Sequence, residues 1–208
     1  MLQKLLDFAD SLSINLDKNQ QQQLLRYATC VWDKKDFLNL TSAATLDEIL
    51  QRHLADGLIA AQTLQKHLPG TAWQLADVGA GCGYIGMTLA AVFPQAQVTL
   101  IESLERRCKF MRWAALQAGI TNCTVKQLRL DKRTTLQFDG VTERAVGPLP
   151  GIFDDCMAAV KPGGIFVAFQ GEHPQTVATH AGIVQPYQLP CDNKPRHLVL
   201  FKKEYATN

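Results

Sequence analysis

The feature that most constrains the fold is a glycine-rich loop that directly follows a short apolar segment. Trp73 to Val78 has the pattern of a buried strand, and Gly79-Ala80-Gly81-Cys82-Gly83 comes immediately after it. The apolar stretch from Tyr84 to Phe93 then has the length of a helix and ends before Pro94. Glycine lets a backbone turn sharply and approach a ligand closely. The sequence therefore predicts a strand–loop–helix unit with a ligand at the loop.

Short apolar runs and amphipathic stretches continue to alternate after this unit. They predict strands at 97–102, 123–128, 138–143 and 164–170, and helices at 104–118, 150–160 and 172–181. The segments 183–189 and 197–203 read as two further strands joined by a turn, which would make the last strand antiparallel. Strand and helix in this rhythm predict an α/β fold, with a mostly parallel sheet covered by helices on both faces.

The first 70 residues show helical patterns and no strand. Asp17 is a good N-cap for a second helix, and Thr45 to Glu48 has the spacing of a capping box for a third helix that runs to about His67. We therefore expect two parts, a helical N-terminal extension at 1–70 and the sheet-containing domain at 71–208.

Composition limits the class of protein and its location. No apolar run among the 208 residues approaches the roughly 20 needed to cross a bilayer, and the first residues lack a signal-peptide pattern. The six cysteines show no C-x-x-C pair and no zinc-ligand spacing, so we expect free thiols and no metal. These features predict a cytoplasmic protein that does not bind membranes.

Two cofactors fit the glycine loop. Residues 81–86 satisfy G-x-G-x-x-G, the weak fingerprint of a dinucleotide site, so a nicotinamide-dependent enzyme stays an alternative. S-adenosylmethionine is favoured by Asp77 at the strand end, where it would reach the methionine amino group, and by the alternating glycines at 79, 81 and 83. The turn at 161–164, which leads into the next strand of the sheet, and the closing hairpin favour it as well.

Glu102 ends the strand predicted at 97–102. A carboxylate at this position can accept hydrogen bonds from both ribose hydroxyls. This position fits either cofactor. It therefore supports binding of a nucleoside at the carboxyl ends of the strands without identifying the nucleoside.

The positive charges cluster although the net charge is only +2. The two clusters are Arg106, Arg107, Lys109 and Arg112, and Lys126, Arg129, Lys132 and Arg133. Such clusters form either a phosphate-binding face or plain solvated surface.

Several motifs outside the loop resemble one family. They are Asn39-Leu40-Thr41-Ser42 after Trp32, Arg52-His53-Leu54-Ala55-Asp56, Glu102-Ser103-Leu104-Glu105-Arg106-Arg107, Arg144-Ala145-Val146 and Arg196-His197-Leu198-Val199-Leu200. With the glycine loop, they make nearly the whole chain similar to the bacterial small-subunit rRNA methyltransferase G family, also called glucose-inhibited division protein B. That family methylates N7 of a guanine in 16S rRNA.

The resemblance implies a seven-stranded class I methyltransferase sheet, Rossmann-like, with S-adenosylmethionine as methyl donor and S-adenosylhomocysteine as product. Together with the loop analysis, it predicts cofactor contacts from Asp77, Gly79, Gly81, Gly83, Tyr84, Glu102, Ser103, Leu130, Asp131 and Arg144. It predicts RNA contacts from His53, Asp56, Arg106, Arg107 and Arg129, with the small ribosomal subunit as partner of a monomeric enzyme.

The chemistry implied by the resemblance needs no general base. Guanine N7 carries a free lone pair and no proton, so alignment of the reactants and stabilisation of charge are enough. Arg144 is the predicted catalytic residue, holding guanine O6 or the cofactor carboxylate, unless it is only a surface charge at a strand end. His53 positions RNA or else bonds to Asp56 one helical turn later. Other RNA, protein or small-molecule substrates, and a non-catalytic ribosome-assembly factor, stay alternatives.

Five positions depart from the residues usual in that family. They are Gly57 for serine, Ile85 for proline, Thr88 near a second proline, Glu143 for a small residue and Gln170 for lysine. The last two lower the positive charge near the predicted substrate entrance. The expected effect falls on the RNA contact and on substrate choice, and not on cofactor binding.

Overall fold

The computed structural model describes residues 1–205. Its helices are α1 (Leu2–Ser11), α2 (Lys18–Leu38), α3 (Leu46–Glu48), the π-helical turn η1 (Ile49–Leu54), α4 (Ala55–His67), α5 (Tyr84–Val92), α6 (Glu105–Ala118) and α7 (Leu149–Ala158). Its strands are β1 (Gln74–Val78), β2 (Gln97–Glu102), β3 (Cys123–Gln127), β4 (Phe138–Arg144), β5 (Val160–Gln170), β6 (Ile183–Leu189) and β7 (Asp192–Lys202).

The strands form one seven-stranded sheet in the order β3-β2-β1-β4-β5-β7-β6. Strands β1 to β5 run parallel, while β7 pairs antiparallel with both β5 and β6. The hairpin predicted for the end of the sheet is thereby confirmed. Because β1 lies between β2 and β4, the carboxyl ends of these three strands are neighbours along one edge of the sheet.

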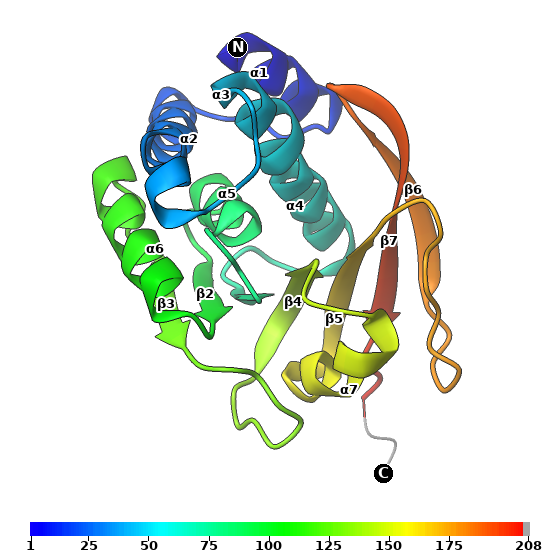
Figure 1. Cartoon of the computed structure of the whole chain (residues 1–208). Helices are drawn as coiled ribbons and strands as arrows, with labels where there is room; N and C mark the ends of the chain where they lie inside the picture. The colour runs from blue at the N-terminus through cyan, green and yellow to red at the C-terminus, as the bar shows by residue number, and fades with distance from the viewer. Residues whose placement is uncertain (206–208) are drawn as a thin grey trace.

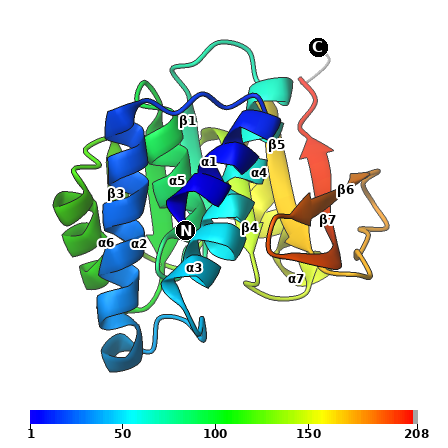
Figure 2. The same ribbon diagram turned by 90° about the horizontal axis from the view of Figure 1, so that it is seen from above.

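Helices cover the two faces of the sheet unequally, as Figures 1 and 2 show. The N-terminal helices, α5 and α6 pack on one face, with strand residues such as Leu75 and Leu100. Among the helices of residues 1–205, α7 alone covers the other face, against residues such as Ala76 and Val141. Neighbouring strand residues point to opposite faces, so Leu75 and Ala76 belong to different cores. Helices on both faces were predicted correctly, but their uneven distribution was not predicted.

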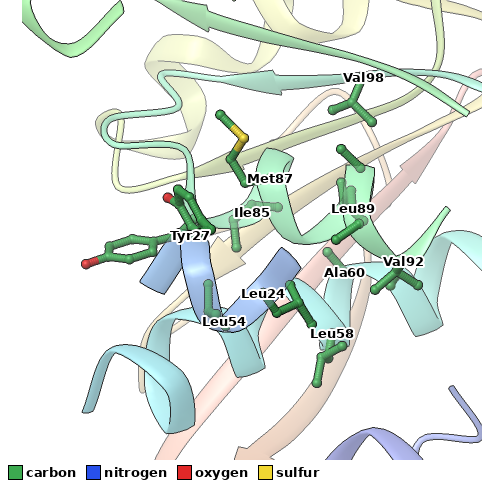
Figure 3. Close-up of a cluster of buried hydrophobic side chains, with 14 of the residues drawn as sticks. Leu24, Tyr27, Leu54, Leu58, Ala60, Ile85, Met87, Leu89, Val92 and Val98 are labelled. Carbon is green, nitrogen blue, oxygen red and sulfur yellow. The ribbon is translucent and has the colours of Figure 1, made fainter. Parts of the chain in front are cut away.

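The N-terminal helices share one hydrophobic core with the sheet and the helix after the glycine loop. Figure 3 shows side chains of α2, η1 and α4 against those of α5. The labelled residues from these helices include Leu24, Tyr27, Leu54, Leu58, Ile85, Met87 and Leu89. The division into 1–70 and 71–208 stays a prediction.

The predicted N-cap at Asp17 forms, whereas the capping box predicted at Thr45 forms only in part, because Glu48 accepts from the Ala44 amide and not from that of Thr45. Asp17 accepts a hydrogen bond from the Gln20 amide at 2.8 Å, and the Gln20 side chain accepts one from the Asp17 amide at 2.8 Å. Thr45 accepts from the Glu48 amide at 3.0 Å. The predicted third helix forms almost without interruption, but η1 inserts a π-helical turn that the sequence pattern did not indicate.

The predicted helix at 172–181 is wrong. This segment contains a turn closed by an isolated bridge between Val177 and His180, and no helix. It offers few large apolar side chains, so a helix there would have no stripe to bury, and packing is what stabilises short helices. Strands β5 and β7 begin at Val160 and Asp192, earlier than predicted.

All six cysteines are free thiols, as expected. Within residues 1–205, no helix is long and apolar enough to cross a membrane. In the same range, no three acidic, histidine or cysteine side chains are grouped as a metal site.

Candidate active site

The glycine loop needs glycine for its backbone. Gly79, Gly81 and Gly83 all have left-handed φ values, of 64°, 64° and 97°, a conformation that side chains disfavour. At Gly83, an added Cβ would also lie only 3.0 Å from Leu100 and 3.1 Å from Met111. At Gly81 it would meet only the Gly79 carbonyl, at 4.0 Å. The space beside Gly81 is therefore open, and a larger residue there acts mainly through backbone strain.

The buried side chain of Asp77 connects the two ends of the glycine loop. Its carboxylate accepts hydrogen bonds from the Gly86 amide at 2.8 Å and from Thr142 Oγ1 at 3.2 Å. The side chain is buried, and this burial raises its pKa to about 6. Asp77 thus ties β1 to the start of α5 and to β4, and it does not line the pocket described next.

A pocket of about 380 Å³ opens at the carboxyl ends of β1, β2 and β4, a size within the range of small-molecule sites. Four of the predicted cofactor residues line it, namely Gly79, Glu102, Ser103 and Leu130. Two arginines predicted to contact RNA line it too, Arg107 and Arg129. The remaining lining residues are Val78, Ile101, Leu104, Leu128, Ala145, Val146, Gly151, Ile152, Asp155 and Cys156.

Glu102 is the most strongly bonded polar residue of the pocket. Its Oε2 accepts from the Gly81 amide at 3.0 Å and from Arg107 at 3.5 Å. Its Oε1 accepts from the Leu104 amide at 2.9 Å and from Ser103 at 3.3 Å. These bonds fix the carboxylate at the end of β2, beside the glycine loop. This placement agrees with the predicted contact with ribose, which stays a prediction.

Four of the other predicted residues lie together on the face of the sheet that the N-terminal helices cover, whereas the pocket is lined by α7 from the other face. Arg144 Nη1 donates to Asp56 Oδ2 at 2.6 Å, and the guanidinium lies 5.5 Å from the centre of the Tyr84 ring. His53 stacks on the same tyrosine, with ring centres 4.3 Å apart and planes 6° apart. Tyr187 from β6 completes the group by donating to Asp56 Oδ1 at 2.9 Å. We call these five residues the arginine cluster.

The alternatives considered for Arg144 and His53 are both wrong. Arg144 is paired with a buried carboxylate and is not a free surface charge. His53 does not bond to Asp56, because the imidazole stacks on Tyr84 and its Nδ1 has no hydrogen-bond partner among residues 1–205. Burial, with Arg144 and Arg52 nearby, lowers the pKa of His53 to about 3. The imidazole is therefore neutral at physiological pH.

The remaining predicted residues lie apart from both groups. Asp131 accepts from Arg133, at 2.7 Å from its amide and 3.2 Å from its guanidinium, and does not line the pocket. Arg106 is exposed on the first turn of α6. Sequence reasoning missed Tyr187 and the four α7 residues in the pocket wall. No local motif marks them, because their contacts join segments far apart in the chain.

The turn after β4 lies against the glycine loop. Ala145 has a left-handed φ of 60°, which is rare for a residue with a side chain. The next residue, Val146, packs so closely on Gly79 that a Cβ there would be 2.3 Å from its methyl group. Strained backbone of this kind concentrates at functional sites. The first glycine of the loop therefore makes room for the β4 turn.

Glu143 precedes Arg144 but points to the α7 face of the sheet. It is 1% exposed. Its Oε2 accepts a long bond of 3.5 Å from the Val146 amide, and its Oε1 has no partner among the described residues. Burial raises the pKa of this carboxyl to about 7.

Two of the departures from the family pattern touch each other. A Cβ on Gly57 would lie 2.4 Å from the Cβ of Thr88. Thr88 Oγ1 in turn donates to the Tyr84 carbonyl at 2.8 Å. Thr88 thus fills the space that a side chain at position 57 would need.

The chain is similar in sequence to known proteins over most of its length. The family model described as rRNA small subunit methyltransferase G matches residues 20–184. Ribosomal RNA small subunit methyltransferase G of Actinobacillus pleuropneumoniae serotype 5b is 34% identical over 98% of this chain and 99% of its own length. The protein of the same name from Alteromonas mediterranea is 33% identical over 94% and 93%.

Solved structures support the fold class. A methyltransferase from Pyrococcus furiosus matches with a TM-score of 0.56 at 12% identity, covering 86% of this chain and 97% of that one. A SAM-dependent O-methyltransferase from Thermotoga maritima matches with a TM-score of 0.55 at 15% identity, covering 85% and 72%. The predicted class I methyltransferase fold is confirmed. From its sequence match over most of its length, the chain belongs to the rRNA small subunit methyltransferase G family.

Proposed function

We propose that this protein transfers a methyl group from S-adenosylmethionine to N7 of a guanine in 16S rRNA. The observation that carries the proposal is the family match over residues 20–184, which includes both the pocket and most of the arginine cluster. The site of methylation within the guanine rests on the resemblance described above.

The residues of the pocket fit the cofactor. Glu102 presents a fixed carboxylate that would accept from the ribose hydroxyls once Arg107 and Ser103 move aside. Leu130, Ile152 and Leu104 supply apolar walls for the adenine. Bound S-adenosylmethionine would supply a methyl group activated by its sulfonium charge.

The arginine cluster suits a reaction that needs positioning and no base. Its only acid is committed to Arg144, and its imidazole is too weak a base to take a proton. Arg144 keeps donor groups beyond the one bonded to Asp56, and one of them would donate to guanine O6, which leaves the N7 lone pair free to attack the methyl group. Since Asp56 and Tyr84 already fix the guanidinium, little reorganisation accompanies binding of the base.

The arginines at the pocket suit an RNA partner. Arg129 and Arg107 line the pocket, and Arg106 is exposed beside them on α6. Positive side chains at the entrance would bind phosphates and orient the nucleotide.

The direct test is transfer of a labelled methyl group from S-adenosylmethionine to small ribosomal subunits that lack this modification, followed by mapping of the labelled base. We expect a single labelled guanine, modified at N7. Binding of RNA without transfer would instead indicate an assembly factor, and transfer only to protein or small molecules would overturn the RNA substrate.

The pocket assignment has its own test. Glu102→Ala should weaken S-adenosylmethionine binding by about 1–3 kcal/mol, because charge-assisted hydrogen bonds to the ribose are lost. Isothermal titration gives the dissociation constant. Glu105→Gln is the matched control, since Glu105 is an exposed acid three residues away that pairs only with Lys109. Equal binding by both variants would remove Glu102 from the site.

A further inference from the structure

Two carboxyl groups stand at the same edge of the sheet, on strands that flank β1. Glu102 ends β2, and Glu143 is the partner of Val78 in the pairing of β1 with β4. Neighbouring strands lie roughly 4.8 Å apart, so the backbones at Glu102 and Glu143 are separated by about 10 Å. The pocket residues Val78 and Gly79 lie between them.

The two carboxyl groups differ in their bonding. Glu102 accepts four hydrogen bonds. Glu143 accepts one long bond, from Val146, and its other oxygen is buried without a partner among residues 1–205. Val146 and the nearby Cys156 belong to the pocket wall. An unpartnered buried oxygen next to a ligand pocket is an acceptor that only a ligand, or a proton, can satisfy.

The charged groups around Glu143 do not neutralise it. From β1, Asp77 is another acid, and its charge further raises the pKa of Glu143. From α7 comes the thiol of Cys156, whose pKa the Glu143 charge raises, and Asp155 of the same helix lines the pocket. Arg144 points to the opposite face and is paired with Asp56. Arg107 is bonded to Glu102, at the other end of the pocket. No described cation therefore pairs with Glu143.

We propose that Glu143 is the group by which the pocket distinguishes cationic S-adenosylmethionine from its uncharged thioether product. It holds a proton when no cofactor is bound, and it releases that proton to solvent when the sulfonium enters. This inference rests on the proposed function, because it needs the ribose to lie on Glu102.

The geometry gives the reason. In S-adenosylmethionine the sulfur is one carbon from the ribose ring. With the ribose hydroxyls on Glu102 and the ligand extending across Gly79, the sulfonium would lie on the side of the pocket nearest Glu143. A cation close to a buried carboxyl group stabilises the ionised form. The reaction then breaks the bond between sulfur and methyl, so that the sulfur keeps the electron pair as a neutral thioether and the positive charge passes to the methylated guanine. Once that guanine leaves with the RNA, the ionised Glu143 has lost its cation, takes up a proton again and holds the thioether product less tightly.

Isothermal titration calorimetry measures how many protons the protein releases when the ligand binds. S-adenosylmethionine is titrated into the protein at pH 6.5 in two buffers with different ionisation enthalpies, and the difference in observed heat gives the number of protons released. We expect roughly half a proton or more for S-adenosylmethionine, given a carboxyl pKa near neutrality. We expect much less for S-adenosylhomocysteine, which carries the same amino-acid group. Between pH 6 and 8, the affinity ratio of the two ligands should shift by up to about tenfold towards S-adenosylmethionine.

Variants separate the possible outcomes. Glu143→Gln keeps the shape of the protonated acid and should abolish both the extra proton and the pH-dependent preference. Glu143→Ser serves as a second variant if the glutamine protein is unstable. Glu105→Gln removes an exposed charge near the pocket and should leave both effects unchanged. Equal proton release for the two ligands, or unchanged release in Glu143→Gln, would overturn this inference but leave the proposed function intact. Failure of the wild-type protein to bind either ligand would overturn the proposed function itself.

Discussion

The two faces of β4 present a contrast between two successive residues. Arg144 points to the face with the N-terminal helices, where Asp56 pairs with its charge and Tyr84 and His53 surround it. Glu143 points to the face covered only by α7, where its carboxyl group is buried with a single long hydrogen bond. A buried ion that has a fixed partner stays charged and holds its position, whereas a buried acid without one titrates near neutral pH. One face is therefore suited to holding a substrate and the other to responding to charge.

The largest expected effect comes from breaking the ion pair. Arg144→Ala leaves the Asp56 carboxylate buried, with Tyr187 as its one remaining hydrogen-bond partner in the described part of the chain. Removing one member of a buried pair costs about 3–5 kcal/mol of unfolding free energy. Urea denaturation measures the loss, with Arg106→Ala as a matched control because Arg106 is exposed.

A double variant sharpens this result. In Asp56→Leu with Arg144→Met, no charge is left without a partner, so much of the lost stability should return. If the double variant is as unstable as Arg144→Ala, the loss comes from packing and not from an unpaired charge.

The second effect concerns the opposite face and depends on pH. The pKa of Glu143 is raised from 4.5 to about 7 by burial. Between these values, the folded protein holds a proton that the unfolded chain has lost, so this residue's contribution to stability falls as pH rises from 4.5 to 7. The full change is about 3 kcal/mol. Urea denaturation across this pH range should show the decrease in wild type relative to Glu143→Gln.

Buried groups that do not interact with Glu143 contribute to both curves alike, whereas Asp77 is coupled to Glu143 because its charge raises the pKa of that residue. His53, whose pKa is lowered to about 3, makes stability rise with pH up to about 6.5, opposite in sign to Glu143. Only the difference between wild type and Glu143→Gln therefore isolates Glu143 and its coupling to Asp77. Curves that stay parallel from pH 4.5 to 7 would show that this carboxyl group ionises normally.

The smallest effect is expected from the residue that supports the ion pair from β6. Tyr187→Phe removes the hydrogen bond to Asp56 and should cost about 1 kcal/mol of stability. Combining it with Arg144→Ala should give a loss that is not the sum of the two, because both act on the same carboxylate. Strict additivity would show that Tyr187 does not support the pair.

The parts of the site that were predictable are those set by local sequence. The glycine loop, Glu102 and the strand ends follow from periodicity and from backbone needs, which act over a few residues. Tyr187 reaches Asp56 across 131 positions, and Ile152 and Cys156 reach the pocket only because α7 packs where it does. Sequence periodicity does not encode such contacts, since they depend on how the whole sheet is assembled.

The failed prediction at 172–181 has a related cause. Pro174 and the β-branched Thr176, Val177 and Thr179 give the segment a low helical propensity, and it presents too little apolar surface to offset this by packing. The environment of Glu143 could not be predicted from the sequence either. Its position was noticed as a departure from the family, yet only the structure shows that the side chain is buried and lacks a cation.

The contact between Gly57 and Thr88 has a consequence for how such sequences diverge. The two positions share one volume, so glycine at 57 and threonine at 88 depend on each other. Any larger residue at 57 overfills the space unless position 88 becomes smaller, and a smaller residue at 88 leaves a hollow behind Tyr84 unless position 57 fills it. A substitution at either position is therefore expected to be tolerated only together with a change at the other.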